Sequence, residues 1–173
     1  MDKRKFAMNY GAILGLALSL FSLLFWAANI DEKQSIIPSI LNNALIIAFI
    51  TYSVIQYRDQ YNNKVISYSA SLKLGTTIAF FSSIIMAFYT FFYISYLKPD
   101  LLSDVLHQTE QSILVSNPEI SDENLDMQLE IAAKFMQPHW MMIMSMLGGT
   151  FMGFLYSALI SLFTKKKDES LII

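Results

Sequence analysis

The chain has 173 residues, of which 54 % are hydrophobic and only 15 % are charged, and its formal net charge at pH 7 is −2. Ordinary soluble domains carry about 25 % charged residues, so this composition argues against a soluble globular protein. The few basic residues argue against nucleic-acid binding. Cysteine is absent, which excludes disulfides, thiolate metal sites and cysteine nucleophiles.

Four long stretches without any charged residue divide the chain. Each is predicted to be a membrane-spanning helix, because about 20 apolar residues in a helix cross a hydrocarbon core about 30 Å thick. The expected spans cover about 6–30, 36–57, 75–97 and 140–163. The first span follows a basic start like a signal peptide, but its length favours a retained helix.

Small residues recur at every fourth position in the first and last spans. They are Ala7, Gly11, Gly15 and Ser19 in the first span, and Ser145, Gly149, Gly153, Ser157 and Ser161 in the last. Such lines let neighbouring helix backbones approach closely. We expect the two lines to pack against each other within one chain, with self-association of two copies through the same faces as the alternative.

The second span contains two amides, Asn42 and Asn43. An amide in hydrocarbon needs a hydrogen-bond partner, so at least one of them is expected to face another helix. The residues from Arg58 to Lys73 are expected to form a polar connection to the third span.

Residues 98–137 form the largest excursion between spans and show two amphipathic helical stripes. The first stripe consists of Leu101, Leu102, Val105, Leu106, Thr109 and Ile113, and the second of Leu125, Leu129, Ala132, Ala133 and Met136. Asn117-Pro118 or Ser121 offers a start for the second helix. We expect both helices to fold back over the end of the bundle or to lie on the membrane surface.

The charged residues divide unequally between the two sides of the membrane. The terminal tails and the 58–74 connection hold nine Lys or Arg and four acids, whereas the opposite side holds three bases and ten acids. Because positive charge stays in the cytoplasm, both termini are predicted to be cytoplasmic and residues 98–137 to lie outside.

Few residues in this sequence are candidates for proton transfer, metal binding or catalysis. The spans contain no Asp, Glu, Lys, Arg or His, so a proton relay is not expected. Asp100, Asp104 and His107 fall at helical intervals and could hold a divalent metal or serve an enzyme at the outer interface. A solvated helix face gives the same pattern and is the simpler interpretation, so no catalytic residue, metal or cofactor is predicted.

The order of these features resembles a bacterial family of small four-span integral membrane proteins, common in the Bacteroidetes lineage and known only as a domain of unknown function. The matching pieces are Tyr10-Gly11 with Gly15, Tyr57-Arg58-Asp59, Ile66-Ser67-Tyr68-Ser69, Leu72-Lys73-Leu74-Gly75, the Tyr89 to Tyr93 aromatic patch and Lys98-Pro99-Asp100. The resemblance implies a location in the bacterial inner membrane, and it assigns no activity.

We therefore predict an all-α integral membrane four-helix bundle, forming one domain over 1–173, with an extracytoplasmic amphipathic helical excursion between spans three and four. The expected function is that of a non-enzymatic scaffold or accessory subunit in envelope assembly, with the lipid bilayer and a membrane protein as partners. The alternative is a translocase, or a helper of a translocase or glycosyltransferase, for lipid or polyprenyl-linked substrates.

Overall fold

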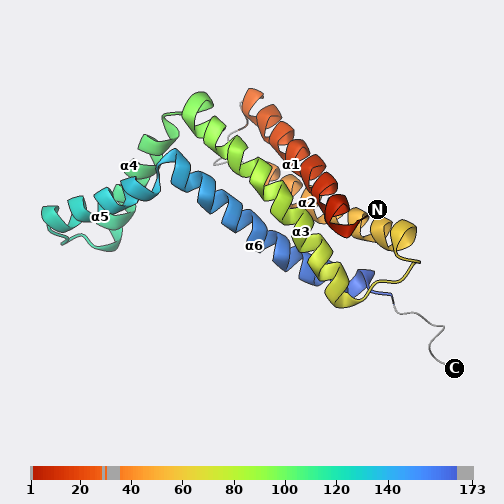
Figure 1. Ribbon diagram of the computed structural model, residues 1–173. Helices are drawn as coiled ribbons and strands as arrows, with labels where there is room; N and C mark the ends of the chain where they lie inside the picture. Colours follow the sequence, from red (N-terminus) through yellow and green to blue (C-terminus); the bar gives the residue numbers. More distant parts are fainter. Residues whose placement is uncertain (1, 29, 31–35, 167–173) are drawn as a thin grey trace. The chain divides into compact units, whose positions relative to one another are not determined.

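The computed structural model of the protein describes residues 2–28, 30 and 36–166. In this part of the chain it has six α-helices and one π-helical segment, arranged as Figure 1 shows. They are α1 (Lys3–Ala27), α2 (Ile37–Tyr61), α3 (Tyr68–Phe92), η1 (Tyr93–Leu97), α4 (Leu101–Ser116), α5 (Asp122–Phe135) and α6 (Pro138–Thr164). The all-α prediction is confirmed.

Four helices are long and apolar enough to cross a membrane, as predicted: α1, α2, α3 with η1, and α6. Their bounds differ from the prediction mainly between α2 and α3. The expected polar connection shrinks to residues 62–67, because α2 continues past Arg58 and Asp59 and α3 begins before Lys73. Arg58 and Asp59 end the apolar run but not the helix, because charged residues are compatible with helical geometry, and the two form an ion pair. Residues 31–35, between the first two expected spans, lie outside the described residues.

The chain forms two compact units. The bundle unit comprises residues 1–86 and 146–173, and the hairpin unit comprises residues 87–145. The expectation of one domain over the whole chain stays a prediction, and the two units are described separately below.

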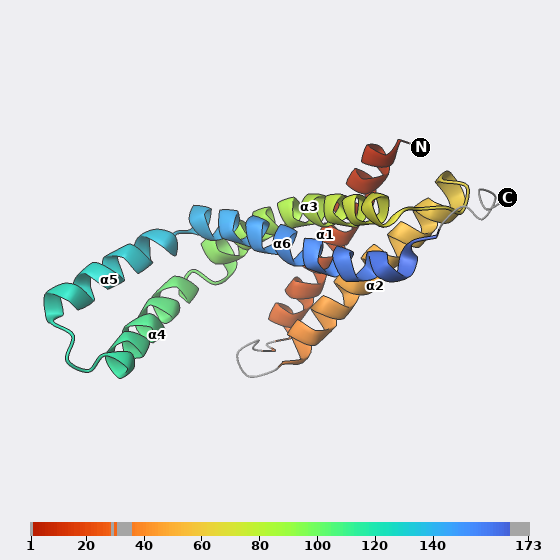
Figure 2. The same ribbon diagram turned by 90° about the horizontal axis from the view of Figure 1, so that it is seen from below.

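The bundle unit consists of two layers of paired helices. Helices α1 and α2 form one layer, and α3 and α6 lie side by side in the other (Figures 1 and 2). The α1–α2 pair is joined by aromatic rings, since Phe6 is fully buried and its ring centroid lies 5.1 Å from that of Tyr57. The layers are joined at α2 and α6 by Tyr156, whose hydroxyl donates a hydrogen bond to Asn43 Oδ1 at 2.6 Å. This contact confirms that one of the two amides faces another helix.

The small-residue lines of α1 and α6 do not pack against each other, so that prediction is wrong. Both lines pack on α3. A Cβ atom added to Gly11 of α1 would lie 2.6 Å from the carbonyl oxygen of Ile78, and one added to Gly153 of α6 would overlap the Cβ of Ala79. The two lines use different faces of α3. The glycines of α1 lie against Ile78, Phe81, Ser82 and Ile85, whereas the line of α6 meets the small residues of α3 at steps of four, namely Ser71, Gly75, Ala79 and Ser83.

The fully buried residues of the bundle unit are mostly apolar. Its largest buried side chains include Phe6, Leu14, Ile50, Leu74 and Ile78. Among the described residues, every buried polar residue is a serine or a threonine: Ser53, Ser71, Ser82, Ser83, Ser157, Ser161 and Thr164. A hydroxyl can bond back to the carbonyl one turn earlier in its own helix, so it enters a hydrocarbon environment at a lower cost than an amide or a charge.

The hairpin unit begins in the last turn of α3. The backbone there widens into η1, in which the N–H of Lys98 bonds to the carbonyl of Tyr93 at 2.9 Å. Pro99 ends the helix because it disfavours helical geometry in the residue before it. Helices α4 and α5 then lie side by side (Figures 1 and 2), which confirms the two amphipathic helices expected in residues 98–137. Of the two expected starts, Ser121 is the residue that precedes α5.

Candidate functional site

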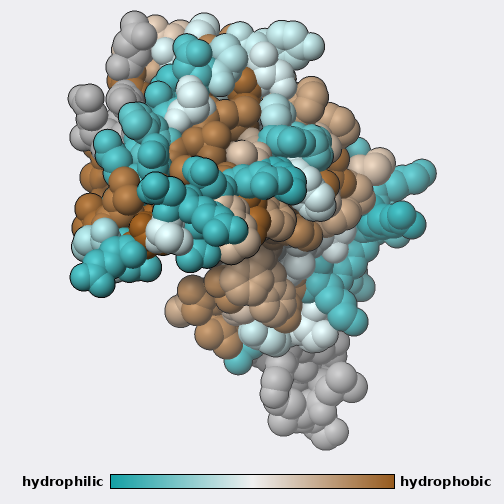
Figure 3. Space-filling view, turned by 90° about the vertical axis from the view of Figure 1, so that its left-hand side faces the viewer, coloured by the Kyte–Doolittle hydropathy of each residue, from teal (hydrophilic) through white to brown (hydrophobic). Residues whose placement is uncertain are grey.

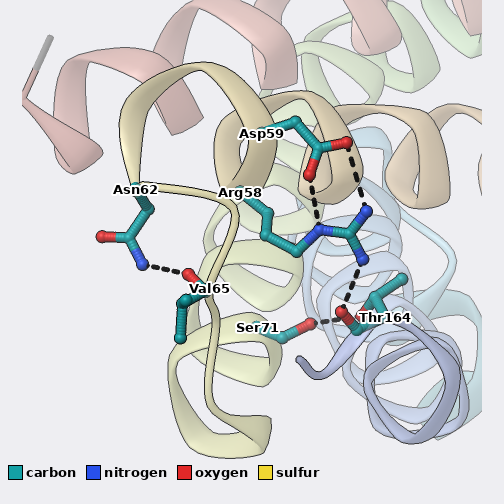
Figure 4. Close-up of polar contacts among 6 residues, drawn as sticks. All are labelled: Arg58, Asp59, Asn62, Val65, Ser71 and Thr164. Atoms are coloured by element: carbon teal, nitrogen blue, oxygen red, sulfur yellow. Dashed lines mark hydrogen bonds and ion pairs between the residues drawn. The ribbon is translucent and has the colours of Figure 1, made fainter. Parts of the chain in front are cut away.

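Three hydroxyl side chains meet inside the bundle unit, where α3 begins and α6 ends. Ser161 donates to the Ser71 oxygen at 2.9 Å. Figure 4 shows the next contact, in which the Ser71 oxygen lies 2.8 Å from the Thr164 oxygen. Thr164 donates to the carbonyl of Ile160 at 3.1 Å. Because each hydroxyl has a single proton, Ser71 must donate to Thr164, and the three groups form a one-way chain that ends on a backbone carbonyl. We call these three residues the hydroxyl cluster.

Arg58 ties the end of α2 to the same place. Its guanidinium contacts both carboxylate oxygens of Asp59, at 2.7 and 3.1 Å, and its remaining terminal nitrogen donates to the Thr164 carbonyl at 3.0 Å (Figure 4). That carbonyl is one of the last four of α6, which have no partner within the helix. The positive charge of Arg58 also lies at the C-terminal end of α6, where it interacts favourably with the negative end of the helix dipole.

The connection between α2 and α3 also contacts the chain just after the end of α6. The N–H of Ile66 bonds to the Lys166 carbonyl at 3.0 Å, and the N–H of Lys166 bonds to the Ile66 carbonyl at 2.9 Å. The chain reaches this pairing through a left-handed turn, with φ of 49° at Asn63 and 63° at Lys64. The side chain of Asn62 closes the turn by donating to the Val65 carbonyl (Figure 4).

Through these contacts the hydroxyl cluster joins α3 to α6. A serine or threonine becomes a nucleophile when a neighbouring base removes its proton. Here the proton of each cluster hydroxyl is directed to the next oxygen along the chain, and Arg58 bonds only to a carboxylate and a carbonyl. The sequence prediction missed the cluster, although the small residues of α3 at steps of four from Ser71 were a signal for it.

Of the three residues singled out from the sequence for metal binding, two share one hollow and the third does not. Asp104 and His107 line an open hollow of about 580 Å³ between α4 and α5, where they join Glu110 and Glu130. Asp100 precedes α4 and is not part of this lining. The His107 side chain is 75 % exposed, and its Nδ1 lies 3.1 Å from Glu110. Among the residues that the structure describes, no group of three His, Asp or Glu is placed to hold a metal ion.

Glu130, which also lines the hollow, is paired with a base of its own helix. Glu130 accepts a hydrogen bond from Lys134 at 2.8 Å, one turn further along α5. This hydrogen bond, together with the positive charge of Lys134, holds the pKa of Glu130 below its ordinary value. Both side chains are largely exposed, which fits a solvated helix face.

Fold and contacts together define an integral membrane protein with four long apolar helices and a helical hairpin between the third and fourth. The chain belongs to the family described as "Protein of unknown function (DUF4199)", which matches residues 9–166. This confirms the family resemblance drawn from the sequence, and the match includes both the hydroxyl cluster and the α4–α5 hairpin. No curated protein matches the chain, and no solved structure does.

Proposed function

We propose that this protein is a non-enzymatic accessory subunit of a membrane assembly in the envelope of a bacterium. In this proposal it resides in the inner membrane with both termini in the cytoplasm, and the α4–α5 hairpin lies outside. The unequal division of Lys and Arg between the two sides supports this orientation.

The observation that carries the proposal is the way the bundle unit uses its polar side chains. Hydroxyls of α3 bond to hydroxyls of α6, as Ser83 does to Thr150 at 2.8 Å, and the Arg58 guanidinium fixes the end of α6. Pumps and ion-coupled transporters instead place ionisable groups within their spans to carry or couple charge. A bundle held by such contacts is suited to support another component.

The close approach of α3 and α6 also weighs against the translocase alternative. A lipid or polyprenyl-linked substrate needs a groove between helices that opens to the bilayer. Gly153 and Ala79 meet at contact distance, and Gly75 lies against Ser157, so the face between these two helices is filled along its length in the bundle unit.

The hairpin supplies the surface that we assign to a partner. Residues 98–137 carry eight acids and two bases, and neither α4 nor α5 has a buried residue. A partner domain with a basic surface would match this charge, since complementary potentials favour encounter and fix the register of a complex. Asp104 of α4 and Asp126 of α5 are exposed carboxylates suited to test this.

The test is purification from the native host in mild detergent, with identification of proteins that accompany the chain. We expect a partner to be retained by the wild type and by the charge-preserving variant D104E/D126E. The variant D104N/D126N should retain about 2- to 30-fold less, because an exposed charge pair contributes about 0.2–1 kcal/mol. Recovery of all three proteins as lone monomers would overturn the proposal.

A further inference from the structure

Helix α5 is apolar on two opposite faces. The face predicted from the sequence is half-buried against α4, through residues such as Leu125, Leu129 and Met136. A second row is formed by Met127, Ile131 and Phe135, which are 55, 50 and 54 % exposed. Residues at steps of four share one face of a helix, so these three form a continuous stripe that points away from α4. We call these three residues the outer stripe.

We infer that the outer stripe is a lipid-binding surface that inserts into the interfacial region of the bilayer beside the start of α6. This inference does not depend on the proposed function, because it concerns lipid rather than a protein partner. In it, α5 lies along the membrane surface as an interfacial amphipathic helix.

The first support is the shortness of the connection to the membrane span. Only Met136 and Gln137 separate α5 from α6, the helix that crosses the membrane. Two residues reach at most about 7 Å. The C-terminal turn of α5, which carries Phe135, therefore cannot leave the neighbourhood of the bilayer surface.

The second support is continuity with an apolar surface that faces lipid. The ring centroid of Phe135 lies 5.9 Å from that of Trp140, in the first turn of α6. Trp140 is 41 % exposed, and one turn further along α6 Met144 is 59 % exposed. Tryptophan is enriched where a span meets the headgroup region. The outer stripe thus extends the lipid-facing row of α6 beyond the first turn of that helix.

The third support is the placement of polar groups around the stripe. The Glu130–Lys134 ion pair borders one side, and the uncharged amide Gln128 borders the other, while the amide of Asn124 lies on the face of the stripe one turn before Met127. Asp126 lies on a different face of the helix. The carboxylates can therefore stay in water while the stripe enters the bilayer. Figure 3 shows one face of the molecule, on which hydrophobic and hydrophilic residues are both exposed.

The absence of cysteine makes the test direct, because every introduced cysteine is the only one in the chain. Nitroxide labels are attached to M127C, I131C and F135C, with D126C as the matched control on a different face of α5. The proteins are placed in nanodiscs of zwitterionic phosphatidylcholine, which avoids repulsion by the acidic hairpin. Collision of each label with oxygen and with a water-soluble nickel chelate is then measured.

We expect the three stripe labels to be more accessible to oxygen than to the nickel chelate, at depths of about 5–10 Å in the headgroup and acyl boundary. The D126C label should show the reverse. Stripe labels with the same aqueous signal as D126C would overturn the inference. So would stripe labels that are protected only in native membranes, since a protein would then cover the stripe.

A second measurement avoids substitution altogether. The wild-type chain in the same nanodiscs is labelled with a lipid-soluble carbene precursor, and the labelled residues are located by mass spectrometry. We expect label on Met127, Ile131 and Phe135 but not on Asp122 or Asp126. Equal or absent labelling of both sets of residues would overturn the inference even if a cysteine variant failed to fold.

Discussion

Gly153 is the position at which the packing of α3 against α6 can be tested most sharply. Replacing it with alanine adds one methyl group to a face where the Cβ of Ala79 is already in the way. Carbon atoms in ordinary contact lie about 3.5–4.0 Å apart, so the two helices have to separate by more than about 1 Å.

The cost of Gly153→Ala has two parts. Overpacking of a filled interface costs about 1–3 kcal/mol. Separation of the helices also lengthens the Ser83–Thr150 and Ser161–Ser71 hydrogen bonds, which now measure 2.8 and 2.9 Å, beyond bonding distance. Each such bond contributes about 0.6 kcal/mol within a membrane. The sum is about 2–4 kcal/mol of lost unfolding free energy.

Gly148→Ala provides the matched control on the same helix. A Cβ added to Gly148 meets no atom within 4 Å. Alanine favours a helix over glycine by up to about 1 kcal/mol, and this gain applies equally to both variants. We expect Gly148→Ala to be neutral or slightly stabilising, so that the two variants differ by about 2–4 kcal/mol.

The assay is equilibrium unfolding in mixed micelles, in which the mole fraction of a denaturing detergent is raised and helix content is followed by circular dichroism. The reasoning is refuted if Gly153→Ala and Gly148→Ala unfold at the same detergent fraction. That result would mean that α3 and α6 are separated enough to accept a methyl group.

Three further predictions use the contacts described above. Arg58→Lys should lower the unfolding free energy by about 1 kcal/mol in the same assay. The lysine ammonium lacks the planar guanidinium geometry that contacts the Asp59 carboxylate and the Thr164 carbonyl at the same time. Tyr156→Phe should cost about 0.6–1.7 kcal/mol, because the amide of Asn43 loses its hydroxyl partner within the membrane. Lys134→Met should raise the pKa of Glu130 towards its ordinary value in a carbon-detected NMR titration, since the hydrogen bond that lowers it is removed. Because the folded pKa is the lower one, the pair stabilises α5 fully above the unfolded value of about 4.3 and loses this contribution as the pH falls through the folded value.

Matched substitutions separate these effects from general ones. Arg4→Lys and Tyr52→Phe alter exposed side chains on α1 and α2, and neither should change the unfolding transition measurably. If Arg58→Lys or Tyr156→Phe behaves like its control, the corresponding contact does not stabilise the bundle. A titration of Glu130 that is unaltered in Lys134→Met would show that the ion pair is not formed in solution.

The four spans could be predicted because each depends on one local property, a run of apolar residues long enough to cross a bilayer. The two hairpin helices could be predicted from their periodicity for the same reason. The continuation of α2 to Tyr61 was not predicted, because the expected span was ended at its first charged residue, whereas Arg58 and Asp59 end the apolar run without ending the helix.

Periodicity alone could not predict which helices the small-residue lines pack against. Three helices carry small residues at steps of four, and spacing alone cannot choose which pairs of lines meet. The structure places α3 between α1 and α6, so Gly11 and Gly153 each contact α3. The hydroxyl cluster is equally non-local, since Ser71 and Ser161 are separated by 90 positions in the sequence.

The outer stripe of α5 was missed for a different reason. A helix with one apolar face shows one stripe, and the residues that include Leu125 and Leu129 satisfy that expectation. Met127, Ile131 and Phe135 fall on the opposite side and read as scattered hydrophobic residues until the burial of each face is known. Only the packing on α4 shows which of the two stripes remains exposed.

The buried serines of α3 have a consequence for the order of events at the ribosome. Helix α6 ends 67 positions after the last residue of η1, and a chain made at roughly 5–20 residues per second needs about 3–13 s to cover that distance. During this interval Ser71 and Ser83 already belong to a completed span, but the helix that will cover them has not been synthesised. Newly inserted α3 therefore stands in the membrane with its hydroxyl side uncovered for those seconds, until α6 packs against it.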